Sequence, residues 1–445
     1  MHKQRGLIWL LQGLAALLLA VPSAQAQIVT APRVRPSGRI SFYVNSSRIT
    51  PTDGPSVTMG DFITNVSYTM PDADGDGVEY GLDVRHAASS DTRRAARISM
   101  YDGYVGGRFA NGHVRVRGGQ MWLNDLGGLG AVSGAVVEYK QGPTTAAAGR
   151  LRVSMFAGTE PKPYELGSTA GIRKMGGYGI LEGNGGRRHV AGYVRLADRN
   201  LIERSVLTTT NFVPIRSKLF FFQAAEYDLV GPAGQGTGGL TYLMVNAHAS
   251  PTNRLDLQGL YHRGRSLDTR SITEDVLAGR PLRDGALDAL LYASAGARVS
   301  VHVARDIRLQ AGYTRDKNNR DSADTGRISL GVSSGNVAGS GVDVTVTDYR
   351  ISRPTGQYNS VYLSVGRQIG RAVYLSGDYS SSVSIVRFTR SDGITVETRP
   401  ETTQIGLSAV VMTGRHISLS VTADTTHDND VKDVRVLAGM TYRFR

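Results

Sequence analysis

The stretch VRVLAGMTYRFR, residues 434–445, decides the fold. Apolar side chains recur at every second position from Val434 to Phe444, and polar or small ones fill the alternate positions, with Leu437 as the exception. Side chains of a β-strand point alternately to its two faces, so this segment has one apolar and one polar face. A helix does not produce a period of two. The pattern predicts a strand between two different environments.

The same alternation recurs along the whole chain. The most regular segments are 78–85, 151–156, 297–303, 307–314, 405–411 and 417–423. A strand that crosses a membrane needs about 9–11 residues, and its side chains face lipid and lumen in turn. We therefore expect an all-β protein, a single large antiparallel transmembrane β-barrel over residues 39–445.

Turn signals between the strands set the expected size and orientation. Short turns such as Ala110-Asn111-Gly112 alternate with longer segments at 158–174, 230–239 and 265–292. Bacterial barrels have short periplasmic turns and longer outside loops. With both termini in the periplasm, this gives about 22 strands, with about 18–22 as the range. Residues 27–38 are then a short periplasmic N-terminal segment.

The longest loop contains one expected helix. Ser271-Ile272-Thr273-Glu274 matches a capping box, in which the first and fourth residues satisfy free amides of the first turn. We expect a short helical extracellular loop that covers the rim of the barrel. The alternative is that it folds into the mouth.

The first 26 residues have the features of a signal peptide. Lys3 and Arg5 precede an apolar run from Leu7 to Val21, and Ala24-Gln25-Ala26 supplies small residues for cleavage. The chain has no cysteine, so no disulfide is expected. We expect export through the inner membrane to the outer membrane of a Gram-negative-type bacterium.

At the C-terminus the chain resembles a known class. Met440-Thr441-Tyr442-Arg443-Phe444 is similar to the closing strand of bacterial outer-membrane β-barrels, which ends in an aromatic residue. The resemblance implies that the barrel-assembly machinery recognises Tyr442 and Phe444. Arg445 departs from the pattern by following the aromatic residue. The chain resembles the porin-like class without matching one subfamily. Strand-like sequence near residue 39 leaves no room for the plug domain of a TonB-dependent transporter.

One short motif suggests a metal. Asp72, Asp74, Asp76 and Asp83 have the spacing of a calcium loop, with Gly77 at its sixth position. The alternative is a solvated turn, for which Asp and Gly are equally suited. No other cofactor is expected.

No motif supports catalysis. Gly331-Val332-Ser333-Ser334-Gly335 matches the nucleophile-elbow pattern, but no helix is predicted after it, as that motif requires. We therefore expect that the protein is not an enzyme.

The excess of basic over acidic residues suggests which solutes the protein would favour. Lys and Arg together number 51, against 38 Asp and Glu. An exported barrel would not meet nucleic acid, so anionic solutes and lipopolysaccharide are the expected partners of this excess. Rings of basic side chains favour anions in pores. The alternation places Glu79, Asp83 and Asp256 on the lumen face together with a larger set of basic residues: Arg85, Arg115, Arg117, Arg152, Arg195, Arg298, Arg308 and Arg327.

Two hypotheses follow. The first is a porin-like channel that passes small, preferentially anionic solutes by diffusion, with loops 158–174 and 265–292 narrowing its mouth. The arginines could instead pair with acids whose position the sequence does not reveal, in a packed lumen. The second hypothesis is an outer-membrane component of an export or secretion apparatus that works with a periplasmic partner. A homo-oligomer is left open.

Overall fold

The computed structural model describes residues 37–70, 75–91, 93–141, 149–162, 165–215, 218–389 and 394–444. The predicted signal peptide, most of the segment 27–38, Asp72, Asp74 and Arg445 lie outside these ranges. In the described part, no helix has the length and apolar character needed to cross a membrane.

The described part of the chain contains 23 β-strands, and all of them belong to one sheet. The first twelve are β1 (Ser37–Pro51), β2 (Val57–Thr69), β3 (Gly77–Ser89), β4 (Arg97–Phe109), β5 (Val114–Trp122), β6 (Ala131–Gln141), β7 (Arg150–Pro161), β8 (Ser168–Glu182), β9 (Arg188–Asp198), β10 (Leu201–Ile215), β11 (Leu219–Asp228) and β12 (Gly239–Thr252). The remainder are β13 (Leu255–Ser266), β14 (Leu290–His302), β15 (Ile307–Asn318), β16 (Thr325–Ser334), β17 (Val342–Arg353), β18 (Gly356–Ile369), β19 (Val373–Thr389), β20 (Thr395–Thr398), β21 (Glu401–Thr413), β22 (Ile417–Asp428) and β23 (Val431–Phe444).

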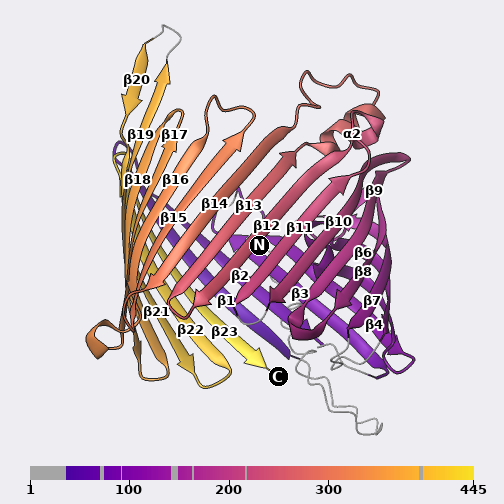
Figure 1. Ribbon diagram of the computed structural model, residues 1–445, viewed down its shortest axis with the longest axis horizontal. Helices are drawn as coiled ribbons and strands as arrows, with labels where there is room; N and C mark the ends of the chain where they lie inside the picture. The colour runs from indigo at the N-terminus through magenta and orange to yellow at the C-terminus, as the bar shows by residue number, and fades with distance from the viewer. Residues whose placement is uncertain are drawn as a thin grey trace. The chain divides into compact units, whose positions relative to one another are not determined.

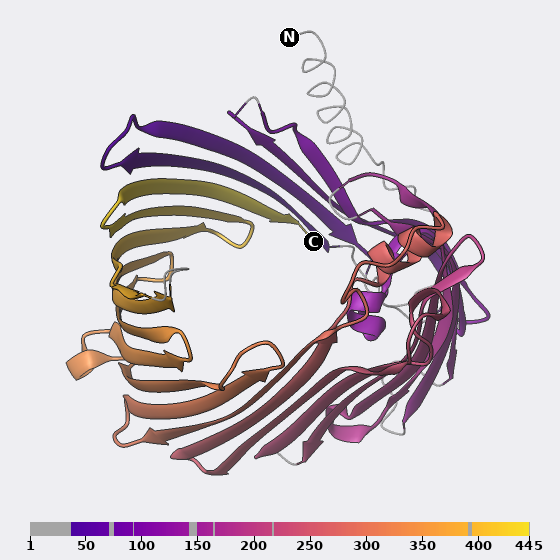
Figure 2. The same cartoon turned by 90° about the horizontal axis from the view of Figure 1, so that it is seen from above.

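The sheet is a closed antiparallel barrel of 22 strands (Figures 1 and 2). Each strand pairs with its neighbour in sequence, and β1 pairs with β23 from Gly38↔Phe444 to Pro51↔Val431. β20 and β21 both pair with β19, at different heights, so they count as one strand of the barrel. Their hairpin with β19 projects at the end that also carries the helix α2 (Figure 1). The predicted all-β barrel of about 22 strands is confirmed.

Alternation assigns the two faces of the barrel. On β23 the side chains of Val436, Met440 and Tyr442 are all about 40% exposed in the isolated chain and share the outer face with Phe444. An apolar outer belt of this kind contacts lipid in transmembrane barrels. Leu437, the exception in the sequence pattern, points inward with Gly439 and Thr441. The first strand begins at Ser37, two residues before the predicted boundary.

The loops correct two expectations. Most of the predicted loop 158–174 is strand, because β7 continues to Pro161 and β8 begins at Ser168. The segment 265–292 is a loop, and it contains the helix α2 (Thr269–Leu277). The predicted capping box is wrong: α2 begins before Ser271, and its N-cap is Asp268, whose carboxylate accepts a hydrogen bond from the Ser271 amide at 3.0 Å.

Candidate functional site: the barrel lumen

Strand register places seven of the eight predicted basic residues on the inner face of the barrel. The pairs Arg108↔Arg115, Arg115↔Glu138 and Lys140↔Arg152 carry one face across β4 to β7, and the same alternation continues through β14 to β16. The inward residues are Arg85, Arg115, Arg117, Arg152, Arg298, Arg308 and Arg327.

Arg195 is the exception. It pairs with Met175, which is 46% exposed on the outer face, while its neighbour Val194 is fully buried on the inner face. The prediction for Arg195 is therefore wrong by one position. Both faces of β9 carry apolar or small residues, so the alternation does not show which of its residues point inward and which point outward.

The lumen side of β6 to β10 is packed with apolar side chains, which the sequence pattern did not reveal. We call this surface the packed wall; its fully or nearly fully buried members are Val132, Val136, Phe156, Ile180, Val190, Val194 and Val206. A 3₁₀ turn, η1 (Asn124–Leu129), connects β5 to β6 and folds onto this wall (Figure 2). Leu126 and Leu129 of η1 are 2% and 6% exposed. Part of the lumen is therefore filled by protein.

A glycine makes this packing possible. A Cβ atom at Gly192 would lie 2.8 Å from Cδ2 of Leu126 and 3.0 Å from Cβ of Tyr178. These separations are shorter than side chains tolerate in a packed interior. Gly192 therefore provides the space into which the leucine of η1 inserts.

Beside the packed wall lies a network of buried ion pairs. The Glu138 side chain is fully buried and accepts from Arg152 at 2.8 Å and from Arg115 at 3.4 Å. The Glu79 carboxylate forms ion pairs with two arginines, at 2.8 Å from Nε of Arg115 and 3.7 Å from Nε of Arg117. Burying a charge without a partner is costly, so these carboxylates offset the cost of placing the guanidinium groups inside the protein. The pairing that the sequence left as an alternative describes this part of the structure: Glu138 is an acid whose position the sequence did not reveal, and Glu79 is one that was expected on the lumen face.

The same network holds η1 in place. Asp125 of η1 forms an ion pair with Arg188 on β9 and lies 3.8 Å from Arg152 on β7. Glu182 on β8 completes the network, 2.7 Å from Arg150 and 3.5 Å from Arg152. Neither Asp125 nor Glu182 was identified as a site residue from the sequence, because only strand pairing and loop folding bring them to the arginines.

The remaining inward arginines differ in their partners. Arg308 lies 3.4 Å from Asp256, which also accepts from Ser250 at 2.6 Å, and Arg327 pairs with Asp316. Arg85 and Arg298 form no ion pair with any residue that the structure describes. Among the inward arginines that were predicted, these two are the ones without a carboxylate partner in the described ranges.

The lumen side of β17 to β22 is hydroxyl-rich. We call it the hydroxyl wall; its inward residues include Thr345, Thr347, Ser360, Tyr362, Ser364, Ser376, Ser380, Ser382, Ser408 and Thr422. Tyr362 donates to Asp378 at 2.6 Å, and Tyr374 donates to Asp343 at 3.1 Å. Hydroxyl groups both donate and accept hydrogen bonds, so this wall can replace part of the hydration of a polar solute.

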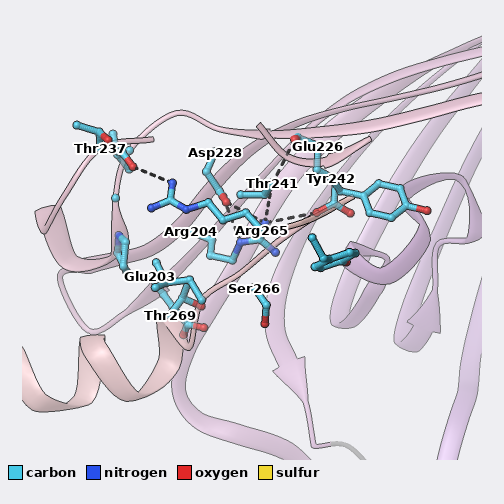
Figure 3. Close-up of a pocket in the computed structure, with 15 residues that line it drawn as sticks. Glu203, Arg204, Glu226, Asp228, Thr237, Thr241, Tyr242, Arg265, Ser266 and Thr269 are labelled. Atoms are coloured by element: carbon cyan, nitrogen blue, oxygen red, sulfur yellow. Dashed lines mark hydrogen bonds and ion pairs between the residues drawn. The ribbon is translucent and has the colours of Figure 1, made fainter. Parts of the chain in front are cut away.

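Two cavities lie on the lumen side of the barrel. One of about 730 Å³ lies beside η1, and its lining includes Asp125, Arg188, Glu226 and Tyr242. The other, of about 300 Å³, lies next to the start of α2 (Figure 3). In it Arg204 donates to both carboxylate oxygens of Asp228, at 3.1 and 3.0 Å.

The helix α2 is tied to the barrel through Arg270. Its guanidinium donates to Glu203 at 2.7 Å and to Glu160 at 2.5 Å. Burial alone would lower the pKa of Arg270, but these two hydrogen-bonded carboxylates raise it above its usual value. α2 therefore lies against β10 at the mouth of the barrel (Figure 2). This position combines the two arrangements considered from the sequence, because the helix lies on the rim and also borders the mouth.

The predicted calcium ligands are only partly described. Asp76 accepts a hydrogen bond from the Gly112 amide at 3.2 Å, and Asp83 points inward on β3. In the described ranges, no group of three or more His, Asp or Glu side chains is arranged to hold a metal ion. Because Asp72 and Asp74 lie outside those ranges, the calcium loop stays a prediction.

Comparison with known proteins gives structural matches alone. No protein-family model matches the chain, and no curated protein sequence matches it. Among solved structures, the match with OpdQ of Pseudomonas aeruginosa spans 92% of this chain and 99% of OpdQ, with 9% identity and a TM-score of 0.44. OccAB4 of Acinetobacter baumannii covers 92% over 98%, with 10% identity and a TM-score of 0.43. The outer membrane protein opdK of Pseudomonas aeruginosa covers 92% over 99%, with 10% identity and a TM-score of 0.41.

The closed barrel, its apolar outer belt and its polar lumen define the class. These are the features of a transmembrane β-barrel.

Proposed function

We propose that this protein is a passive outer-membrane channel for small polar solutes, with a mild preference for anions. The observation that carries the proposal is the difference between the two sides of the lumen. η1 and the packed wall fill one side, while the hydroxyl wall lines the other. Barrels of 16–18 strands already enclose an aqueous channel, and this one has 22. The six-residue η1 and the nine-residue α2 are short segments to fill a lumen of that width.

The anion preference rests on few residues. Arg115, Arg117 and Arg152 are paired with buried carboxylates, so each contributes less field to a passing ion than an unpaired arginine would. Arg85 and Arg298 have no such partner in the described part of the chain, and both point into the lumen. A positive potential in the lumen favours anions, so these two side chains would set the selectivity.

The test is single-channel conductance of the purified barrel in a planar bilayer, with a salt gradient across it. We expect steady conductance and a reversal potential on the anion side, which Arg298→Glu shifts toward cations. Arg195→Glu, the same charge change on the outer face, is the matched control and should leave the reversal potential unchanged.

Two outcomes would contradict the proposal. A folded barrel that does not conduct would favour the alternative, an export component that needs its periplasmic partner. Conductance that prefers cations, or that responds equally to both substitutions, would remove the role assigned to Arg298.

A further inference from the structure

A pocket of about 850 Å³ lies at the barrel rim, where β12, β13, β14 and β15 meet the loop that follows α2. Register shows which face it belongs to. Arg263 on β13 pairs with Leu243 and with Ala293, and Arg265 pairs with Leu291. These residues share the face of Tyr261 and Leu257, which is the apolar outer face of the barrel. The pocket is therefore lined from the lipid side of the wall.

Three arginine side chains line this pocket, and two of them have no side-chain partner in the described ranges. Arg263 and Arg320 line it, and in the described ranges their guanidinium groups take part in no ion pair or side-chain hydrogen bond. Arg265 donates to the Thr237 carbonyl at 3.3 Å, and its other donors have no partner in the described ranges. Two carboxylates, Asp284 and Asp288, also line the pocket, so the three guanidinium groups exceed the acids by one.

Part of the lining is apolar, although Thr237 and Asn319 are also among the lining residues. Leu240, Leu287, Ala289 and Leu291 contribute to the same pocket. Outward side chains nearer the middle of the barrel, among them Val245 and Tyr261, continue this apolar surface. Cations above an apolar base, at the boundary of the hydrocarbon belt, match a ligand with an anionic head and an acyl chain.

We propose that this pocket binds a phosphorylated membrane lipid. Arg263, Arg265 and Arg320 would bind the phosphate, for which guanidinium groups provide paired donors. One acyl chain would lie along Leu291 and the outer face of β13 and β14. A free phosphate would use the cations and leave the apolar lining unused, so the shape of the site favours the lipid. Basic pockets at the membrane boundary of other proteins bind lipid head groups in this way.

The experiment is a lipid titration of the purified full-length barrel in non-ionic detergent, read by native mass spectrometry. The probes are bis-phosphorylated lipid A, the same lipid with its phosphates removed, and inorganic phosphate as competitor. The pocket variant is Arg263→Gln with Arg320→Gln. The matched control is Arg48→Gln with Arg173→Gln, which removes two outward cations near the same end of the barrel but away from the pocket.

We expect the phosphorylated lipid to be retained and the pocket variant to lose about fivefold in affinity per residue removed, since a basic residue near an anionic lipid surface contributes roughly that factor. The control variant should bind as the unmodified protein does. Equal binding of the dephosphorylated lipid would overturn the proposal, as would equal losses in both variants or displacement of the lipid by phosphate at matching concentration. Arg263→Lys with Arg320→Lys, which keeps both charges, should retain most of the binding.

Discussion

The carboxylate of Asp125 in η1 is paired with the guanidinium of Arg188 on β9, so one ion pair joins a loop to the inner wall of the barrel. The two residues are 63 positions apart in sequence. This contact fixes how far η1 reaches into the lumen, and therefore how wide the remaining passage is.

Under the proposed channel function, loss of this pair should widen the passage through the lumen. In Asp125→Asn the attraction to Arg188 and Arg152 is reduced, so we expect η1 to leave the packed wall for part of the time, with larger or more variable single-channel conductance. Asp91→Asn is the matched control, because it removes a loop aspartate that pairs with the exposed Arg93. If both variants conduct as the unmodified barrel does, η1 does not limit the passage.

The apolar part of the same contact gives a second prediction. Leu126→Ala removes a side chain that is 2% exposed, and truncating a buried leucine costs about 2–5 kcal/mol of packing free energy. We expect conductance to rise as it does for Asp125→Asn. Both changes act on docking of one turn, so their effects in the double variant should not add. Additive effects would show that the two side chains act independently.

A third prediction concerns stability. Glu138→Gln leaves Arg115 and Arg152 without their shared carboxylate in a buried site, and breaking a buried ion pair costs about 3–5 kcal/mol. Denaturant unfolding, followed by the change in gel mobility between folded and unfolded barrel, should show the loss. Glu397→Gln is the control, because Glu397 also contacts two arginines, Arg387 and Arg399, but at the exposed hairpin. Equal unfolding midpoints for the two variants would contradict the structural role of Glu138.

The anchor of α2 gives a fourth prediction. In Arg270→Gln the buried Glu203 loses its cation, so α2 should separate from β10 more often. Trypsin should then cut the following loop, at Arg280 or Arg283, several-fold faster than in the unmodified protein. Lys162→Gln, which removes an exposed pair with Glu165, should not change the cleavage rate. An unchanged rate in Arg270→Gln would mean that other contacts hold the helix.

Much of the fold could be predicted from the sequence, because alternation is a local property. The outer face of β23 follows directly from Val436, Met440 and Tyr442. The phase of β9 could not be predicted, since Val194 on the inner face and Ala191 on the outer face are both compatible with either environment. The loop 158–174 was misassigned because Gly158, Thr159 and Pro161 are also typical of turns, although here they belong to or end a strand.

The lumen was harder to predict for a different reason. The partners of the arginines are set by register between strands: Glu138 meets Arg115 and Arg152 across separations of 23 and 14 residues. The position of η1 depends on the space at Gly192, which no pattern in the sequence marks. The sequence therefore identified most of the arginines that face the lumen, apart from Arg195, and the carboxylates that pair with them could be found only from the structure.

The seam between β1 and β23 has a consequence for biogenesis. Ser41 and Thr441 share a hydrogen bond of 2.9 Å across 400 residues of chain, and fourteen residue pairs close this seam. No part of it can form until the last strand has been synthesised and exported. Until then β1 has an unpaired edge, which is prone to pair with other chains. An incomplete chain would therefore need a chaperone to cover that edge, and a truncation of the final strand should cause aggregation in the periplasm.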